Sequence, residues 1–211
     1  MLDREVVLLG YSGHAYVVAD AALSAGINLK YYAEKAEQVK DPFYLKYIGD
    51  ENDNNFKGWN SRIDFILGVG DNGIRMKIAK FVNSKGGNLI NVIHPKANIS
   101  KKVSIGNGVF VGSGACINPL VDIQKYSIIN TGSIVEHECT VGMGSHIAPG
   151  ALLAGNVKVG NNTFIGANSV IKEGVTVGDN VIIGAGSVII NDVESNKKVV
   201  GNPSRELWKV K

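Results

Sequence analysis

The sequence predicts a small parallel α/β domain over residues 1–93, a parallel β-helix over residues 94–192 and a basic tail over residues 193–211. Two observations carry this prediction. In the first part, apolar strand-like runs alternate with segments of helical apolar spacing, which is typical of a parallel sheet. In the second part a six-residue motif recurs without interruption, which is typical of a repeat fold.

The N-terminal elements follow one another in the order that a parallel α/β domain requires. EVVLLG (5–10) is a continuous apolar run and predicts a buried strand, and AYVVADAALSAG (15–26) has helical spacing. LKYYAE (29–34) and RIDFILGVG (62–70) predict a second and a third strand. DNGIRMKIAKFVNSKG (71–86) predicts a second helix, after which NLINVIHP leads into the repeat.

Glycine turns follow the first and third predicted strands, at Gly10–His14 and at GVGDNGIR (68–75). A turn of this kind is the usual place for a phosphate to meet the N–H groups of a helix N-terminus. The first turn lacks the middle glycine of GxGxxG, which disfavours an NAD-binding protein, although Glu34 lies where a ribose-binding acid would be expected. Two such turns at neighbouring strand ends would form one crevice for a nucleotide-linked sugar. A tight turn without a ligand is the alternative interpretation.

The repeat divides residues 97–192 into sixteen consecutive hexads, and the third position is Ile, Val or Leu in every one, from Ile99 to Ile189. Glycine, asparagine and other small residues gather at the fourth and sixth positions and supply tight turns. One inward aliphatic residue per short strand, with three strands per coil, predicts a triangular column of about five coils and about 25 Å.

Composition restricts the class of protein. Of the 211 residues 26 are glycine, and no apolar run approaches the roughly 18 residues that a membrane helix needs. The N-terminus opens with an acidic residue and lacks a signal-peptide cleavage site, so we expect a cytoplasmic protein that does not enter a membrane. Cys116 and Cys139 are too few for a disulfide framework.

The formal charge of +3 resides in the tail, which holds five basic residues against two acidic ones. The basic residues are Lys197, Lys198, Arg205, Lys209 and Lys211. Nucleic-acid binding would require a broader basic face with interleaved aromatic residues. A short basic tail suits a small polyanion, and a solvated tail without a ligand is equally ordinary.

Two histidines and two glutamates are crowded into one stretch of the repeat, SIVEHECTVGMGSH (133–146). His137 and His146 both lie off the inward third position, so neither is expected in the core. Glu138 can orient the ring of His137 and raise its basicity. Two column histidines cannot supply the three protein ligands of a catalytic zinc site, so no metal is expected. Cys139 is expected to be a small apolar filler.

Three segments, GYSGH, IVEHECTVG…SH and VGNPSREL, resemble those of the bacterial hexapeptide-repeat sugar acetyltransferases. The resemblance is to the bacillosamine and perosamine N-acetyltransferases and the sialic acid O-acetyltransferases, and it covers nearly the whole chain. It implies a Rossmann-like N-terminal domain, a left-handed β-helix, and a homotrimer with active sites between subunits. It also implies acetyl-CoA as co-substrate and an amino sugar linked to UDP or GDP as acceptor, within glycan biosynthesis.

The resemblance also implies roles for individual residues. His137 matches a general base, Glu138 the acid that increases its basicity, and His146 a histidine at the acetyl-CoA site. The pantetheine arm would run along four small residues, Gly166, Ala167, Gly184 and Ala185. Ser12, Gly13, His14 and Gly70 match the nucleotide-sugar contacts. The chain departs from the UDP-sugar enzymes at Glu34 and Lys35, where those enzymes tend to be acidic.

The implied chemistry is direct acetyl transfer to an amine, with no metal and no acyl-enzyme. A histidine can accept the proton near neutral pH, and backbone amides or His146 would stabilise the oxyanion. The charge of the tail suggests that Lys197, Lys198 and Arg205 meet the phosphates of CoA. A sugar O-acetyltransferase of the sialic acid type and a non-catalytic β-helix scaffold remain alternatives.

Overall fold

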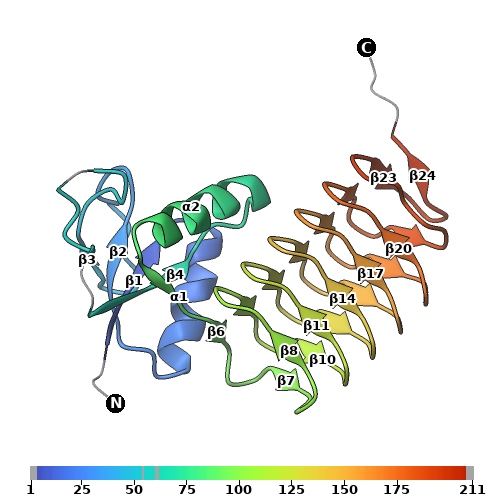
Figure 1. The fold of residues 1–211 in the computed structure, drawn as a ribbon, viewed down its shortest axis with the longest axis horizontal. Helices are drawn as coiled ribbons and strands as arrows, with labels where there is room; N and C mark the ends of the chain where they lie inside the picture. Colours follow the sequence, from blue (N-terminus) through green and yellow to red (C-terminus); the bar gives the residue numbers. More distant parts are fainter. Residues whose placement is uncertain (1–3, 54, 60–61, 208–211) are drawn as a thin grey trace.

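The computed structural model describes residues 4–53, 55–59 and 62–207. Figure 1 shows an α/β domain beside one end of a long column of coils, with the first described residues in the domain and the last ones at the far end of the column. The predicted division into a parallel α/β part and a repeat part is therefore confirmed. In the part of the chain that the structure describes, no helix is long and apolar enough to cross a membrane.

The N-terminal domain is a five-stranded parallel sheet with helices on its faces. Its elements are β1 (Glu5–Leu9), α1 (His14–Ser24), β2 (Leu29–Ala33), β3 (Lys46–Tyr47), β4 (Ile63–Leu67), α2 (Asn72–Ser84) and β5 (Asn88–Leu89). The strand order is β3-β2-β1-β4-β5, so the direction of winding reverses between β1 and β4. Ligands of such sheets bind outside the carboxyl ends of the strands at this reversal. The predicted strands and helices are present, and the short edge strands β3 and β5 are additions.

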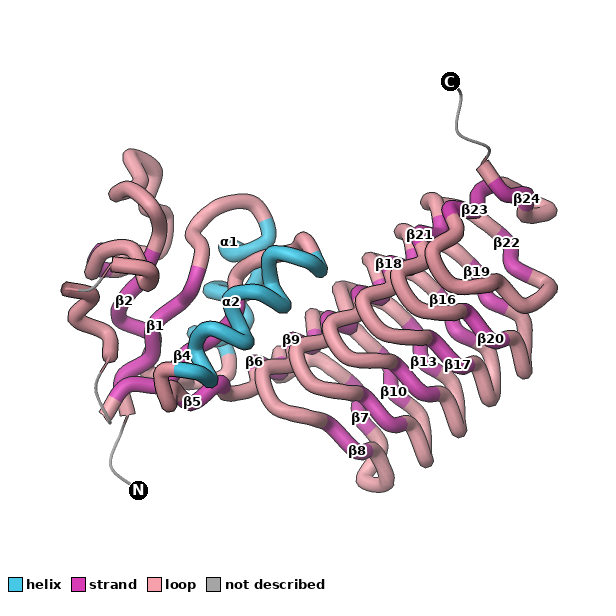
Figure 2. Tube along the Cα trace, turned by 45° about the horizontal axis from the view of Figure 1, so that its top comes forward, coloured by secondary structure: helices cyan, strands magenta, loops and turns pink. Residues whose placement is uncertain are grey.

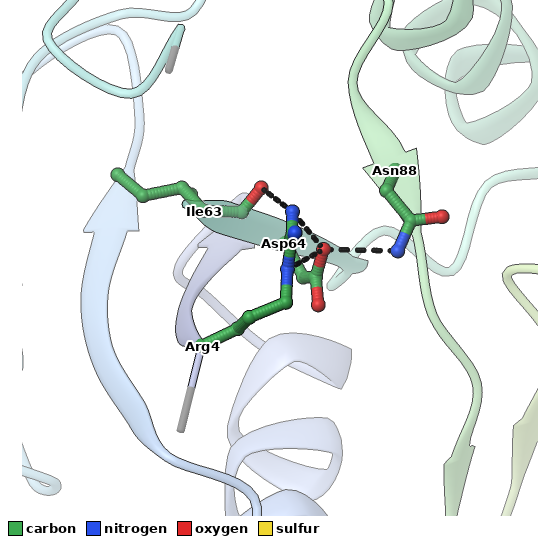
Figure 3. A network of polar contacts seen from close by, with 4 residues as sticks. All are labelled: Arg4, Ile63, Asp64 and Asn88. Carbon is green, nitrogen blue, oxygen red and sulfur yellow. Dashed lines mark hydrogen bonds and ion pairs between the residues drawn. The ribbon is translucent and has the colours of Figure 1, made fainter. Parts of the chain in front are cut away.

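A polar network fastens the other end of this sheet (Figure 3). Arg4 forms an ion pair with Asp64 at 2.8 Å, and Asn88 donates to the same carboxylate oxygen at 2.9 Å. The Arg4 guanidinium also donates to the carbonyl oxygen of Ile63. Because these residues precede or belong to β1, β4 and β5, the network fixes the three strands at the end away from the glycine turns.

The column consists of two-residue strands that form three parallel sheets. The strands are β6 (Val92–Ile93), β7 (Asn98–Ile99), β8 (Ser104–Ile105), β9 (Phe110–Val111), β10 (Cys116–Ile117), β11 (Asp122–Ile123), β12 (Ile128–Ile129), β13 (Ile134–Val135), β14 (Thr140–Val141), β15 (His146–Ile147), β16 (Leu152–Leu153), β17 (Lys158–Val159), β18 (Phe164–Ile165), β19 (Val170–Ile171), β20 (Thr176–Val177), β21 (Ile182–Ile183) and β22 (Val188–Ile189). Each coil contributes one strand to each sheet. The third hexad positions form one continuous core, which confirms the repeat.

The sixth hexad position is the left-handed turn of the coil. Seven glycines, four asparagines and only three other residues have positive φ there, since these two residue types adopt that conformation most easily. The three others are Leu120, Tyr126 and Glu138. Tyr126 is explained by its contact with the N-terminal domain, where its hydroxyl accepts from Asn83.

Most of the segment predicted as a tail extends the column. β23 (Lys198–Val200) pairs with β21, and β24 (Arg205–Glu206) pairs with β23 in antiparallel orientation. Figure 2 shows both strands at the end of the column farthest from the α/β domain. Lys209 and Lys211 lie outside the described residues.

The N-terminal domain packs against one face of the column. This docked face is the outer side of the sheet β6-β9-β12-β15-β18-β21-β23. Phe110 and Ile128 of that face lie in one apolar cluster with Ala15 and Val18 of α1. The opposite edge, here called the free edge, is the stack of turns between the other two sheets and includes residues 118–120, 136–138 and 154–156.

Candidate active site

The two glycine turns lie side by side at the carboxyl ends of β1 and β4. Gly68 N donates to Leu9 O at 2.8 Å, and Gly10 N donates to Ala33 O at 2.9 Å. A Cβ on Gly68 would lie 2.8 Å from both the Cβ of Ala15 and the carbonyl oxygen of Gly10, so glycine is required for this approach. The two turns therefore lie together at the point where the winding of the sheet reverses.

The first turn opens directly into α1. Ser12 and Gly13 are exposed, and no side chain caps the first N–H groups of α1. Glu34 accepts from Tyr11 N at 3.2 Å and from Lys35 N at 2.9 Å. Its carboxylate therefore links the turn to the end of β2. This gives Glu34 a structural role in addition to the predicted role of binding a ribose.

His146 lies outside the apolar core of the column, but it is buried under the N-terminal domain, which its position in the hexad did not indicate. It is only 7% exposed. Asn130 Oδ1 accepts from Thr131 N at 2.8 Å, so the Asn130 amide nitrogen faces His146 Nε2 at 3.0 Å and donates to it. His146 Nδ1 therefore carries the proton and donates to Gly70 O at 3.3 Å. Both ring nitrogens have protein partners, which leaves the ring no N–H for an oxyanion.

Burial keeps the two histidines of this region neutral. Desolvation, with the charge of Arg75 and the neighbouring His14, lowers the pKa of His146 to about 3. Desolvation and the charge of Arg75 lower the pKa of His14 to about 4. The His14 ring packs edge-on against Phe110 at 5.2 Å between centroids.

We expect the protein to lose stability as the pH falls from about 6.5 toward 4. The folded-state pKa values of His14 and His146 lie below the unfolded value, so the unfolded chain binds more protons in this window and the full stability is present only above it. The loss should be on the order of 3 kcal/mol for each histidine. Urea titrations at each pH measure it. His146→Gln should reduce the dependence of the free energy of unfolding on pH in this window, whereas His94→Gln, outside this interface, should not.

A pocket of about 570 Å³ opens where the N-terminal domain meets the docked face. His146, Phe164 and Ile182 follow one another at paired positions up that face. The rest of the lining is Gly70, Asp71, Asn72, Gly73, Asn162 and Asn180. Lys198 continues the same row beyond Ile182, so an apolar strip leads from the domain to an exposed cation.

The four small residues predicted for the pantetheine arm lie along the edge of the docked face. The Gly166–Ala167 and Gly184–Ala185 turns follow β18 and β21 in successive coils. Gly166 and Gly184 have structural reasons to be glycine, because a Cβ would meet Ala185 N at 2.5 Å and Val200 Cγ1 at 2.5 Å respectively. Ala185 is exposed and Ala167 is half-buried.

His137 and Glu138 stand apart from this pocket, on the free edge. His137 Nδ1 lies 3.0 Å from Glu138 Oε2, and both side chains are more than half exposed. Glu138 has φ of 60° at a turn position that elsewhere is mostly glycine or asparagine. In one copy of the chain the pair lies across the column from the pocket, because the free edge joins the two sheets that do not form the docked face.

Cys139 is buried, and its thiol donates to Ala154 O at 3.1 Å. Burial raises its pKa to about 11, so it is no nucleophile near neutral pH. Within the described residues, no group of three or more His, Cys, Asp or Glu side chains could hold a metal ion.

The acetyltransferase domain of PglB from Neisseria gonorrhoeae is 31% identical and superposes with a TM-score of 0.91 over 97% of this chain and 100% of that one. The chain belongs to the PglD-type hexapeptide-repeat acetyltransferases. Residues 5–82 match the PglD N-terminal domain family, and residues 156–191 match the bacterial transferase hexapeptide family. PerB from Caulobacter crescentus, solved with CoA and GDP-perosamine, is 31% identical with a TM-score of 0.90 over 97% of each chain.

Sequence reasoning missed two residues that build this site. Arg75 carries the contact between the domains, and Asn130 fixes the tautomer of His146. Nothing in the helical pattern of residues 71–86 distinguishes Arg75 from a surface arginine. Asn130, at a fourth hexad position where glycine is common, was a weak signal.

Proposed function

We propose that the protein transfers the acetyl group of acetyl-CoA directly to the amine of a nucleotide-linked 4-amino sugar, with His137 as general base. That it is an acetyl-CoA-dependent sugar N-acetyltransferase follows from the family. The observation that carries the finer proposal is the His137–Glu138 pair at 3.0 Å on an exposed edge of an otherwise inert repeat.

The nucleotide-linked sugar binds at the two glycine turns. The uncapped N–H groups of α1 behind Ser12 and Gly13 suit its phosphates. Gly70 and His14 border the side that leads to the pocket, since a Cβ on Gly70 would lie 3.4 Å from the Cβ of His14. Lys35 is exposed shortly after β2 and leaves GDP and UDP both open.

Acetyl-CoA lies along the docked face. The strip of Phe164 and Ile182 offers apolar surface to the pantetheine arm, and the pocket beside His146 and Gly70 receives the thioester. Lys198 and Arg205 are exposed and have no acidic partner within 4 Å among the described residues, so both are available to phosphates. Lys197 is less suitable, because it pairs with Glu206 at 3.1 Å.

A complete site needs two copies of the chain. The pocket lies on the docked face and the base on the free edge, so one copy must bring its His137 to the pocket of its neighbour. Each copy has one such edge and one such face, and repeating the contact around a threefold axis closes a homotrimer. The site then combines the glycine turns and His146 of one subunit with the catalytic pair of another.

The chain's residues then move one proton and position two reactants. As the amine nitrogen forms its bond to the thioester carbon, His137 Nε2 accepts a proton from that nitrogen. Glu138 holds the proton on Nδ1 and stabilises the imidazolium. When the C–S bond breaks, His137 returns the proton to the departing CoA thiolate. Backbone N–H groups of the column stabilise the oxyanion, since both nitrogens of His146 have partners.

A thiol-release assay tests this function. Purified protein and acetyl-CoA are offered UDP-, GDP- and dTDP-linked 4-amino sugars and free sialic acid in parallel. Turnover of an amino sugar supports the proposal and identifies the nucleotide. Turnover of sialic acid alone would establish an O-acetyltransferase, and binding of acetyl-CoA without turnover of any acceptor would favour a scaffold.

We expect the double variant Lys198→Glu/Arg205→Glu to raise the Kd for CoA about tenfold, because two exposed cations near phosphates contribute up to about 1 kcal/mol each. Calorimetry at low and high salt measures this, and the difference should shrink as salt screens the charges. Lys158→Glu is the matched control, since Lys158 is exposed on another sheet of the column. An unchanged Kd in the double variant would refute the phosphate contact.

A further inference from the structure

Gly155 occupies an unusual place in the repeat. Among the sixteen fifth hexad positions it is the only glycine, and the others range from alanine to lysine. It lies one coil beyond His137 on the free edge, where Asn156 N donates to His137 O at 2.8 Å. The only fifth hexad position without a side chain is therefore directly beside the residue proposed as the base.

The backbone does not account for this glycine. Gly155 is not among the residues with positive φ, so an L-residue fits its conformation. On the same edge the fifth positions of four other coils carry side chains, at Lys101, Pro119, Glu173 and Asn191. The geometry of the coil thus tolerates a side chain at this level of the turn.

The imidazole ring of His137 explains why position 155 is glycine. A Cβ on Gly155 would lie 2.6 Å from Cε1 and 2.7 Å from Nε2 of His137, well inside van der Waals contact. Gly155 itself is buried, although the edge around it is exposed. The ring therefore lies over the α carbon of Gly155 while its Nδ1 stays 3.0 Å from Glu138 Oε2.

We propose that Gly155 is a positioning residue, whose missing side chain lets the His137 ring keep its contact with Glu138 and hold Nε2 in a defined place on the free edge. A methyl group at this position would push aside the ring and leave the backbone where it is, because the clash is with the end of a side chain. Only the catalytic consequence rests on the proposed function; the packing of the ring on Gly155 does not.

The test is Gly155→Ala in the full-length protein. We expect kcat to fall by about 10- to 100-fold, since displacement of a catalytic group by about 1 Å can cost that much. KM for both substrates and Tm should stay close to wild type. In the His137→Ala background the same substitution should have no further effect on kcat. Glu173→Ala, one coil further along the edge, is the matched control and should leave kcat unchanged.

A nuclear Overhauser contact between His137 Hε1 and the Gly155 α protons reports the packing without any substrate. It should be present in the wild type. An unchanged kcat in Gly155→Ala, or a loss of kcat that persists without His137, would overturn the positioning role. If His137→Ala itself retained full turnover, the proposed base would be wrong, and the Overhauser contact would still decide whether the ring packs on Gly155.

Discussion

Replacement of His137 by alanine is expected to lower kcat for the amino-sugar acceptor by about 10²- to 10⁴-fold, the range that a positioned general base contributes. Without the imidazole, the amine must lose its proton to water as it attacks. KM for acetyl-CoA should change little, because His137 lies on the free edge and outside the pocket that we assign to the donor. Steady-state thiol release with saturating acetyl-CoA measures both constants.

Two further variants sharpen this experiment. Glu138→Gln should reduce kcat less, by about tenfold, because an amide can still accept from Nδ1–H but does not stabilise the imidazolium. His94→Ala is the control, since His94 is a half-exposed histidine at the start of the column. Mixed oligomers of His137→Ala with an inactive pocket variant should regain part of the activity, because some sites then combine two intact halves. Wild-type kcat in His137→Ala would exclude it as the base.

The largest effect on stability is expected from Arg75→Met, at about 3–5 kcal/mol of the free energy of unfolding. Arg75 is 1% exposed and joins the N-terminal domain to the column. Its guanidinium donates to Tyr126 O at 2.8 Å, to Gly144 O at 2.7 Å and to Gly70 O at 2.9 Å. Methionine fills much of the same volume but leaves these buried carbonyl groups without donors.

Urea denaturation followed by both circular dichroism and Trp fluorescence measures this loss. Lys80→Met removes a cation from the exposed side of the same helix and should change the free energy of unfolding by less than about 0.5 kcal/mol. If Arg75→Met were as stable as Lys80→Met, the carbonyl contacts would not be what joins the two parts. Because Arg75 also holds Gly70 beside His146, we expect the variant to bind acceptor and donor less well even while folded.

The column could be predicted from the sequence because a hexapeptide repeat is a local pattern. Each coil buries its own third-position side chains against the next coil, so spacing alone sets the strand and turn positions from Ile99 to Ile189. The same applies to the glycine turns after β1 and β4, since a strand followed by a turn and a helix has few arrangements in a parallel sheet. His137 and Glu138 are adjacent in sequence, so they could likewise be recognised as a pair.

Contacts between distant segments could not be predicted in this way. The burial of His146 depends on where a separate domain rests, and no local pattern marks the second residue of one hexad as covered. The order of hydrogen bonds from Thr131 through Asn130 to His146 and Gly70 exists only once that domain is in place. The same is true of Arg75, whose acceptors in the column, Tyr126 O and Gly144 O, lie 51 and 69 residues away in sequence.

The sequence by itself therefore determined the α/β domain, the repeat column and the proposed catalytic pair, because each is marked by a local pattern or by a fixed period. Only the tertiary structure decided that His137 and the pocket around His146 face opposite sides of one chain. The physical reason is that the three strands of one coil lie on three different faces of the column. Two histidines nine residues apart therefore project from different sides, and in the proposed mechanism a second copy of the chain brings them together.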